Sequence, residues 1–104
     1  FSIDVSAASF SDYSLSGTDR NGSVSGNDAS ITVKVGDTIN FNLSVSGHPF
    51  YIKTTQGTGT NNLANSVSRN GSVNGTVSWT PNAAGTYYYQ CSLHNGMYGT
   101  ITVN

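Results

Sequence analysis

Four residues of the scarcest types in the chain could together bind one soft metal ion. The chain holds one cysteine, one methionine and two histidines, and Cys91, His94 and Met97 fall within seven consecutive positions. The other histidine, His48, follows an alternating apolar segment and lies between a glycine and a proline. A thiolate, two imidazoles and a weak axial thioether are typical of a blue-copper electron-transfer site, so this grouping predicts copper binding.

Each of these residues has a simpler interpretation when it is taken alone. A lone cysteine on a strand is usually a small buried apolar side chain. Met97 alone could cap the core, and His94 alone could be a solvated loop residue. Zinc fits less well than copper, because zinc prefers four strong cysteine, histidine or carboxylate ligands. The grouping of all four rare residues therefore favours one copper ion, with the predicted ligands His48, Cys91, His94 and Met97.

The composition restricts the fold and the partners. Ser, Thr, Asn and Gly supply 52 of the 104 residues and charged residues only 9%, with a net charge of -1. Ser, Asn and Gly favour turns over helix interiors, and Thr suits strands, so an all-β fold is expected. Because the four basic residues are dispersed, no basic patch is expected to bind nucleic acid. No apolar run approaches the ~20 residues of a membrane span.

Period-two alternation of apolar residues indicates the strands that must position these ligands. Around seven or eight short strands separated by Gly/Asn turns predict a β-sandwich or barrel in one domain, 1–104. The polar segment Thr55–Asn70 lacks alternation and is predicted to be a long solvated loop. The clearest strand segments are 1–5, 31–35, 39–45, 50–53, 73–79, 87–91 and 101–103.

The expected strands can bring the four predicted ligands to one point. Cys91 ends a strand, so its sulfur can be held rigidly, and the turn containing Gly96 can return His94 and Met97 to the same point. His48 arrives from a neighbouring strand. A site tied together in this way keeps both oxidation states of a metal in nearly one geometry, which suits electron transfer.

Two stretches of the chain resemble the cupredoxins, the plastocyanin-like blue copper proteins. The stretch Val77–Val103 is similar to the C-terminal half of a cupredoxin, and Val33–Phe41 followed by Gly47-His48 is similar to an earlier part of that fold. The resemblance implies a Greek-key β-sandwich of seven to eight strands that carries single electrons on one type 1 copper ion. It also implies an extracytoplasmic location, in a periplasm, a thylakoid lumen or outside the cell. By position, it makes His48, Cys91 and His94 the equatorial ligands and Met97 the axial one.

The sequence departs from plastocyanin at three points. The spacing Cys-x2-His-x2-Met is shorter than that of plastocyanin and closer to that of amicyanin. Pro49 lacks the N–H that plastocyanin supplies to the sulfur at this position, so we predict that the N–H of Leu93 donates to the sulfur of Cys91 instead. Gln90 stands where plastocyanin has a tyrosine between acidic patches, and no acidic cluster is evident here.

These departures bear on the partners and on the function. We expect a monomer that meets protein redox partners near His94 through an uncharged or apolar patch, with Leu93, Pro49 and Tyr98 as candidates. An enzyme is not expected, because four ligands leave no open metal position for substrate. A copper storage or delivery protein, and a structural β-sandwich module that retains a copper site, are the alternatives to an electron carrier.

Overall fold

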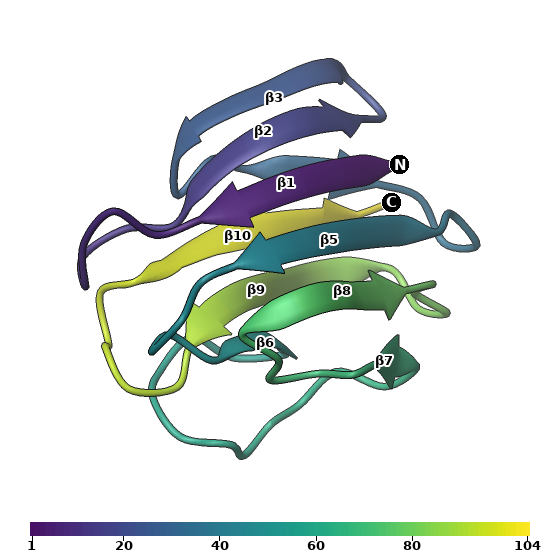
Figure 1. The fold of residues 1–104 in the computed structure, drawn as a ribbon. Coiled ribbons are helices and arrows are strands. Elements are labelled where there is room, and N and C mark those ends of the chain that lie inside the picture. The colour runs from purple at the N-terminus through teal and green to yellow at the C-terminus, as the bar shows by residue number, and fades with distance from the viewer.

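The chain folds into two β-sheets that face each other (Figure 1). Apolar and polar side chains alternate along its strands, so each sheet has an apolar inner face. The computed structural model describes residues 1–104 and contains no helix. The strands of the larger sheet lie in the order β3-β2-β1-β5-β8-β7, and those of the smaller sheet in the order β4-β10-β9-β6. The strands are β1 (Ser2–Ser6), β2 (Ser14–Asp19), β3 (Gly22–Asn27), β4 (Ile31–Val33), β5 (Ile39–Ser44), β6 (Phe50–Lys53), β7 (Val67–Ser68), β8 (Asn74–Trp79), β9 (Gly85–Cys91) and β10 (Tyr98–Val103).

The all-β sandwich predicted from the sequence is confirmed, with ten strands where seven or eight were expected. The additional strands come from segments with weak alternation. In β2 and β3 the outward positions are Ser, Thr and Asn, and each strand buries only one apolar side chain, Leu15 or Val24. Most neighbouring strands are antiparallel, whereas β1 pairs with β5, and β4 with β10, in parallel.

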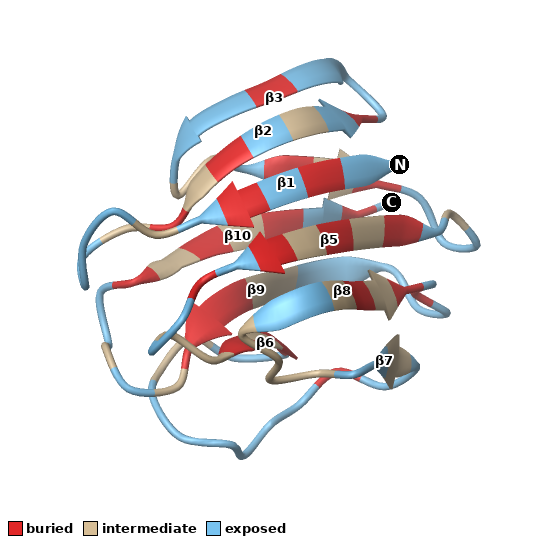
Figure 2. Ribbon diagram, in the orientation of Figure 1, coloured by how far each residue is buried: buried red, intermediate tan, exposed pale blue.

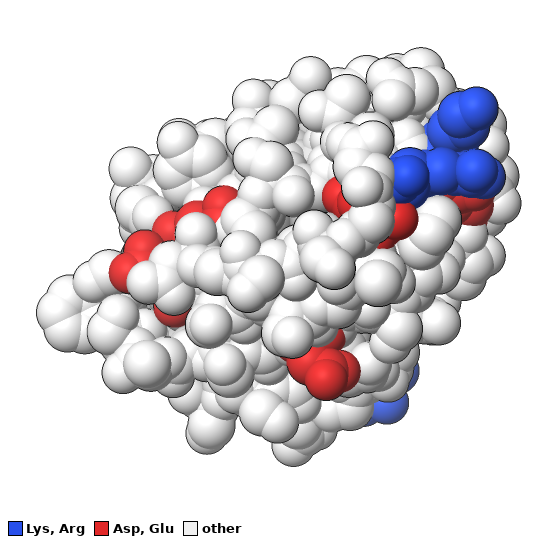
Figure 3. Space-filling model, turned by 90° about the horizontal axis from the view of Figure 1, so that it is seen from above, with Lys and Arg blue, Asp and Glu red and all other residues white.

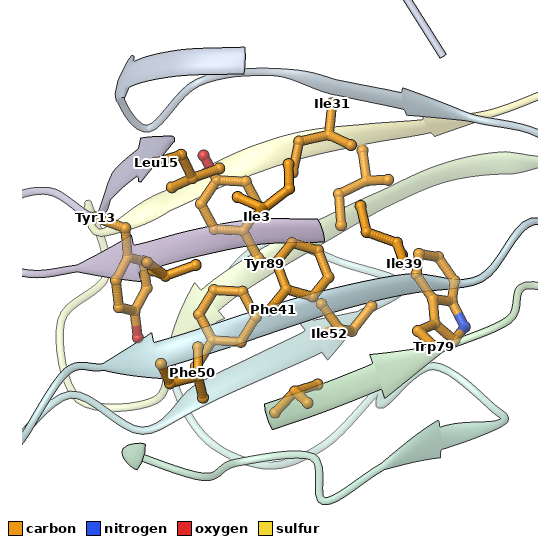
Figure 4. Close-up of a cluster of buried hydrophobic side chains, with 14 of the residues drawn as sticks. Ile3, Tyr13, Leu15, Ile31, Ile39, Phe41, Phe50, Ile52, Trp79 and Tyr89 are labelled. Atoms are coloured by element: carbon orange, nitrogen blue, oxygen red, sulfur yellow. The ribbon is translucent and has the colours of Figure 1, made fainter. Parts of the chain in front are cut away.

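The space between the sheets is filled by one cluster of 21 buried residues (Figures 2 and 4). In β5 the buried Ile39, Phe41 and Leu43 alternate with partly exposed asparagines. Aromatic rings pack at the centre, where the rings of Phe50 and Tyr89 stack with their centroids 5.6 Å apart. Each large apolar side chain buried in this way stabilises the fold by about 1.5–3 kcal/mol.

Several strands end or begin at one end of the sandwich, and this arrangement positions the site. Strands β5 and β9 end there, and β6 and β10 begin there, since Phe50 pairs with Cys91 and Tyr98 with Gln90 (Figure 1). The loops 7–13, 45–49 and 92–97 therefore gather at this end.

The segment Thr55–Asn70 is more ordered than a solvated loop. It contains the short strand β7, and Leu63 forms a β-bridge with Lys53. The indole N–H of the buried Trp79 donates to the carbonyl of Asn65, at 3.0 Å. The ordered structure of this segment could not be predicted from its polar side chains, because hydrogen bonds to main-chain groups hold it in place and apolar residues do not alternate along it. Separately, no helix has the length and apolar character that crossing a membrane requires.

Gly99 provides a test of the packing between β9 and β10. It lies opposite Tyr89, and a Cβ added at Gly99 would overlap the tyrosine ring. The ring cannot easily give way, because it is buried and its hydroxyl donates to the carbonyl of Ala29, at 2.6 Å. Gly99→Ala is therefore expected to lower the free energy of unfolding by about 1–3 kcal/mol, measured by chemical denaturation.

The matched control for this substitution is Gly96→Ala. A Cβ at Gly96 meets nothing within 4 Å, so the change is expected to stay within about 0.5 kcal/mol. Equal unfolding free energies for the two variants would show that the Tyr89 ring is not packed against β10 as described.

Candidate metal centre

Three of the predicted ligands meet at the end of the sandwich where the loops gather. The sulfur of Cys91 lies 3.4 Å from Nδ1 of His94 and 3.9 Å from Nδ1 of His48. One ligand atom from each of the three residues lies within 4.8 Å of the other two. Cys91 is fully buried, and both histidines are half-buried.

The donor atoms present suit copper. Sulfur and imidazole ligands bond first-row metals at about 2.0–2.3 Å, and ligands of one ion then have separations of this size. No carboxylate belongs to the group. One thiol with two imidazoles is the equatorial set of a blue-copper site, so the residues that the fold brings together fit the ion that the sequence predicted.

Met97 lies at the far end of the ligand loop, which runs from Cys91 to Met97. Its side chain is fully buried. The N–H of Cys91 donates to the carbonyl of Met97 at 2.9 Å, so the two ends of the loop are bonded to each other. The N–H of Met97 donates to the carbonyl of His94 at 3.2 Å, which tightens the turn. The axial role of Met97 stays a prediction.

His48 is held in place by its backbone. Its N–H donates to the carbonyl of Val45 at 2.8 Å, which forms a tight turn after β5. The hydroxyl of the fully buried Tyr13 donates to the carbonyls of His48 and Pro49, at 2.9 and 3.2 Å. Burial, with Cys91 nearby as the next cause, raises the pKa of Tyr13, so this hydroxyl stays a donor. No sequence pattern indicates this role of Tyr13, because the contact spans 35 positions.

The predicted hydrogen bond from Leu93 to the sulfur is wrong. The hydrogen-bonding neighbours of the Cys91 sulfur are the ring nitrogens of the two histidines, and none is a backbone N–H. Leu93 instead lies at the tip of the ligand loop with its side chain 63% exposed.

A second residue that sequence analysis missed covers one side of His94. The ring of Phe10, from the loop 7–13, lies with its centroid 5.7 Å from that of His94, and Phe10 is 69% exposed. The imidazoles of His48 and His94 also pack together, with centroids 5.1 Å apart. A lone phenylalanine among serines gave no sign of this contact, which depends on how the loop returns over the site.

Two carboxylates, those of Asp12 and Asp28, lie at the end of the sandwich that carries the candidate ligands, where Asp28 accepts the backbone N–H of Tyr13. The only salt bridge joins Arg20 to Asp37, with nitrogen and oxygen 2.7 Å apart, and it lies beside Lys34 at the other end of the sandwich. This bridge holds the pKa of Asp37 well below its usual range. On the face shown in Figure 3, basic side chains lie together with acidic ones at one end, and further acidic side chains lie toward the other end.

Comparisons with known proteins agree with this geometry. A family model of copper-binding proteins of the plastocyanin/azurin family matches residues 14–104. Among solved structures, rusticyanin from Thiobacillus ferrooxidans has a TM-score of 0.60 at 21% identity, covering 99% of this chain and 76% of its own. Reduced rusticyanin has a TM-score of 0.61 at 19% identity, covering 99% and 78%. At these identities the likeness is one of fold. No curated protein sequence matches the chain.

Asp28 provides a pH test of how Tyr13 is held. Its carboxylate accepts the backbone N–H of Tyr13 at 3.0 Å. Burial, with a smaller contribution from Asp12, raises the pKa of Asp28 from 3.8 to about 6. The folded protein then binds a proton that the unfolded chain has lost, so the free energy of unfolding should fall as pH rises from about 4 to about 6.

The variant Asp28→Asn keeps an oxygen acceptor for the N–H of Tyr13 but cannot ionise. Denaturation over this pH range should show the wild type losing stability relative to the variant as pH rises. A difference between the two proteins that stays constant with pH would show that Asp28 does not hold the raised pKa.

Proposed function

The chain belongs to the copper-binding proteins of the plastocyanin/azurin family, and from this premise we propose that it carries single electrons as a type 1 copper protein. The observation that carries the proposal is the group of one thiol and two imidazole nitrogens within 4.8 Å at the edge of the core. In this proposal His48, Cys91 and His94 are the equatorial ligands of one copper ion, and Met97 is the axial ligand.

The chain's own residues supply rigidity and limit access by water. Cys91 and Met97 are fully buried, so solvent does not reach their sulfur atoms. Tyr13 and the closed ligand loop fix the backbone that carries the histidines. A bound copper ion supplies a reversible one-electron change between Cu(I) and Cu(II). Ligands that stay in place during this change keep the reorganisation energy small, which favours fast electron exchange.

The part-exposed ring of His94 is the proposed route for the electron. Around it lies a surface that we call the His94 patch, made of Phe10, Leu93, Pro49 and the imidazole itself. Phe10 and Leu93 are the most exposed large apolar side chains in the molecule. Protein redox partners are proposed to dock on this patch through apolar contacts. Tyr98, an earlier candidate, contributes less because it is half-buried and packs against Tyr88.

The proposed domain organisation, oligomeric state and location rest on the family and on the fold together. We propose one domain over 1–104, because one core cluster joins both sheets, and a monomer in an extracytoplasmic compartment. An enzymatic step is not proposed, since four ligands would leave no open position for substrate. The larger of two surface hollows, about 460 Å³, is lined by none of the candidate ligands and lies on the outer face of the six-stranded sheet, beside Asp4 and Asn42.

Copper storage or delivery remains a second candidate function, and it predicts a different behaviour. A delivery site must release its ion readily, whereas the buried thiol and closed loop described above favour retention. Slow electron exchange together with rapid loss of copper to a chelator would favour delivery over electron transfer.

Titration with Cu(II) tests the proposed ligands. The metal-free protein should gain an intense visible thiolate-to-copper band and a narrow copper hyperfine splitting in its paramagnetic resonance spectrum. Cys91→Ser should abolish the band completely, because it removes the only thiolate, whereas Ser46→Ala, close to His48 and exposed, should keep it. A wild type that binds copper without this band would contradict the proposal.

Substitutions in the His94 patch test the docking surface. Leu93→Ser and Phe10→Ser should each slow bimolecular electron exchange by about fivefold, the effect of losing a contact worth about 1 kcal/mol. Exchange should depend weakly on ionic strength, because the chain has few charged residues and a net charge of only -1. The control Val35→Ser changes an exposed apolar residue far from the site. Equal slowing by all three variants would remove the patch as the docking site.

A further inference from the structure

Gln90 is a buried amide that faces away from the core of the sandwich. It lies between Tyr89 and Cys91, whose side chains enter the core, so alternation along β9 points Gln90 to the outer face of the four-stranded sheet. It is nonetheless fully buried. Its Nε2 lies 2.9 Å from the carbonyls of Cys91 and His94, and 3.3 Å from those of Asn95 and Met97. One side chain thus contacts backbone acceptors along the whole ligand loop.

The carbonyl end of Gln90 is also held. Its Oε1 accepts the backbone N–H of Gly57 at 3.2 Å and the side-chain amide of Gln56 at 3.4 Å. Gln56 reaches the ligand loop directly as well, because its Nε2 donates to the carbonyl of Asn95 at 2.7 Å. The N–H of Gly59 donates to the carbonyl of Ser92 at 3.0 Å. The segment 56–59 therefore lies along the ligand loop.

Lys53 anchors this segment from the far side. Its amine donates to the carbonyl of Gly57 at 2.7 Å and to those of Thr58 and Gly59 at 3.3 Å. The side chain is only 1% exposed and forms no salt bridge, so backbone carbonyls are its partners. Burial lowers the pKa of Lys53. A buried ammonium is costly unless it is hydrogen-bonded, so the three carbonyls are held close to it.

We propose that Lys53, Gln56, Gln90 and the segment 56–59, which together we call the Gln90 network, hold the ligand loop in its metal-binding shape before copper arrives. Gln90 is thus a positioning residue that acts on Cys91 and His94 through their carbonyls. The importance of this role for electron transfer rests on the function proposed above.

The physical reason lies in the hydrogen bonds of the ligand loop. Inside the loop, the bonds joining Cys91 to Met97 and Met97 to His94 are the only backbone pairs. The carbonyls of Cys91 and Asn95 find their partners in the Gln90 network. The contacts of Gln90 with the carbonyls of Cys91 and Met97 are buried. A buried carbonyl that loses its donor is costly, so without Gln90 the loop would open toward water and carry its ligands with it.

Gln90→Met tests the proposal, because methionine has a similar length and volume but offers no amide. The first readout is amide hydrogen exchange in the metal-free protein. Exchange at the hydrogen-bonded loop amides of Ser92 and Met97 should rise by about tenfold, from the loss of two short hydrogen bonds. The second readout is the Cu(II) form, whose hyperfine splitting and reduction potential should both shift. A purely structural role would lower the melting temperature without moving these two properties.

Two more variants keep the test decisive. Gln56→Ala removes a half-buried side chain, does not disturb the core, and should give a smaller effect in the same loop. Val33→Ala truncates a fully buried residue of β4 and should lower the melting temperature without selective exchange at 92–97.

Loop exchange in Gln90→Met and Gln56→Ala that equals the wild type, or that rises no more than in Val33→Ala, would overturn the proposal. Failure of the wild type to form a blue copper site would instead contradict the proposed function, while the exchange measurement on metal-free protein would still decide on the Gln90 network.

Discussion

The candidate copper site depends on how a loop of five residues between Cys91 and Met97 is closed. The hydrogen bond from the N–H of Cys91 to the carbonyl of Met97 extends the ladder between β9 and β10. The loop therefore starts and ends on two paired central strands, and His94 must turn back toward the sulfur. Carbonyls that point inward in so short a turn need donors, and Gln90 supplies them from the same strand.

Gln90 and Cys91 are consecutive in β9 but have different roles, because side chains alternate between the two faces of a strand. Cys91 faces the core and presents its buried sulfur at the end of the sandwich where the loops gather, whereas Gln90 faces outward and supports the backbone of the loop. The backbone of His48 is held separately, by the hydroxyl of Tyr13. The three candidate ligand atoms are thus held by contacts with several parts of the chain. The exposed apolar side chains of Phe10 and Leu93 form the surface proposed for docking beside this rigid interior.

The sequence was informative where a signal is local or compositional. Clean alternation from Ile39 to Val45 predicted β5, and the grouping of rare residue types predicted the meeting of His48, Cys91 and His94. It was uninformative where the outcome depends on packing between distant segments. The polar strands β2 and β3, the contact of Phe10 with His94 and the order in the segment 56–59 leave no periodic pattern. The hydrogen bond predicted from Leu93 failed because backbone direction within a tight loop cannot be deduced from residue types.

Crystal structures of the metal-free and the Cu(II)-loaded protein would test the central claim most directly, namely that the folded chain presents its copper ligands already in place. We expect one copper ion bonded to the sulfur of Cys91 and to Nδ1 of both His48 and His94, with these atoms displaced by less than about 0.5 Å between the two forms. Copper bound elsewhere, or a ligand loop that rearranges when the ion binds, would contradict a preorganised type 1 site.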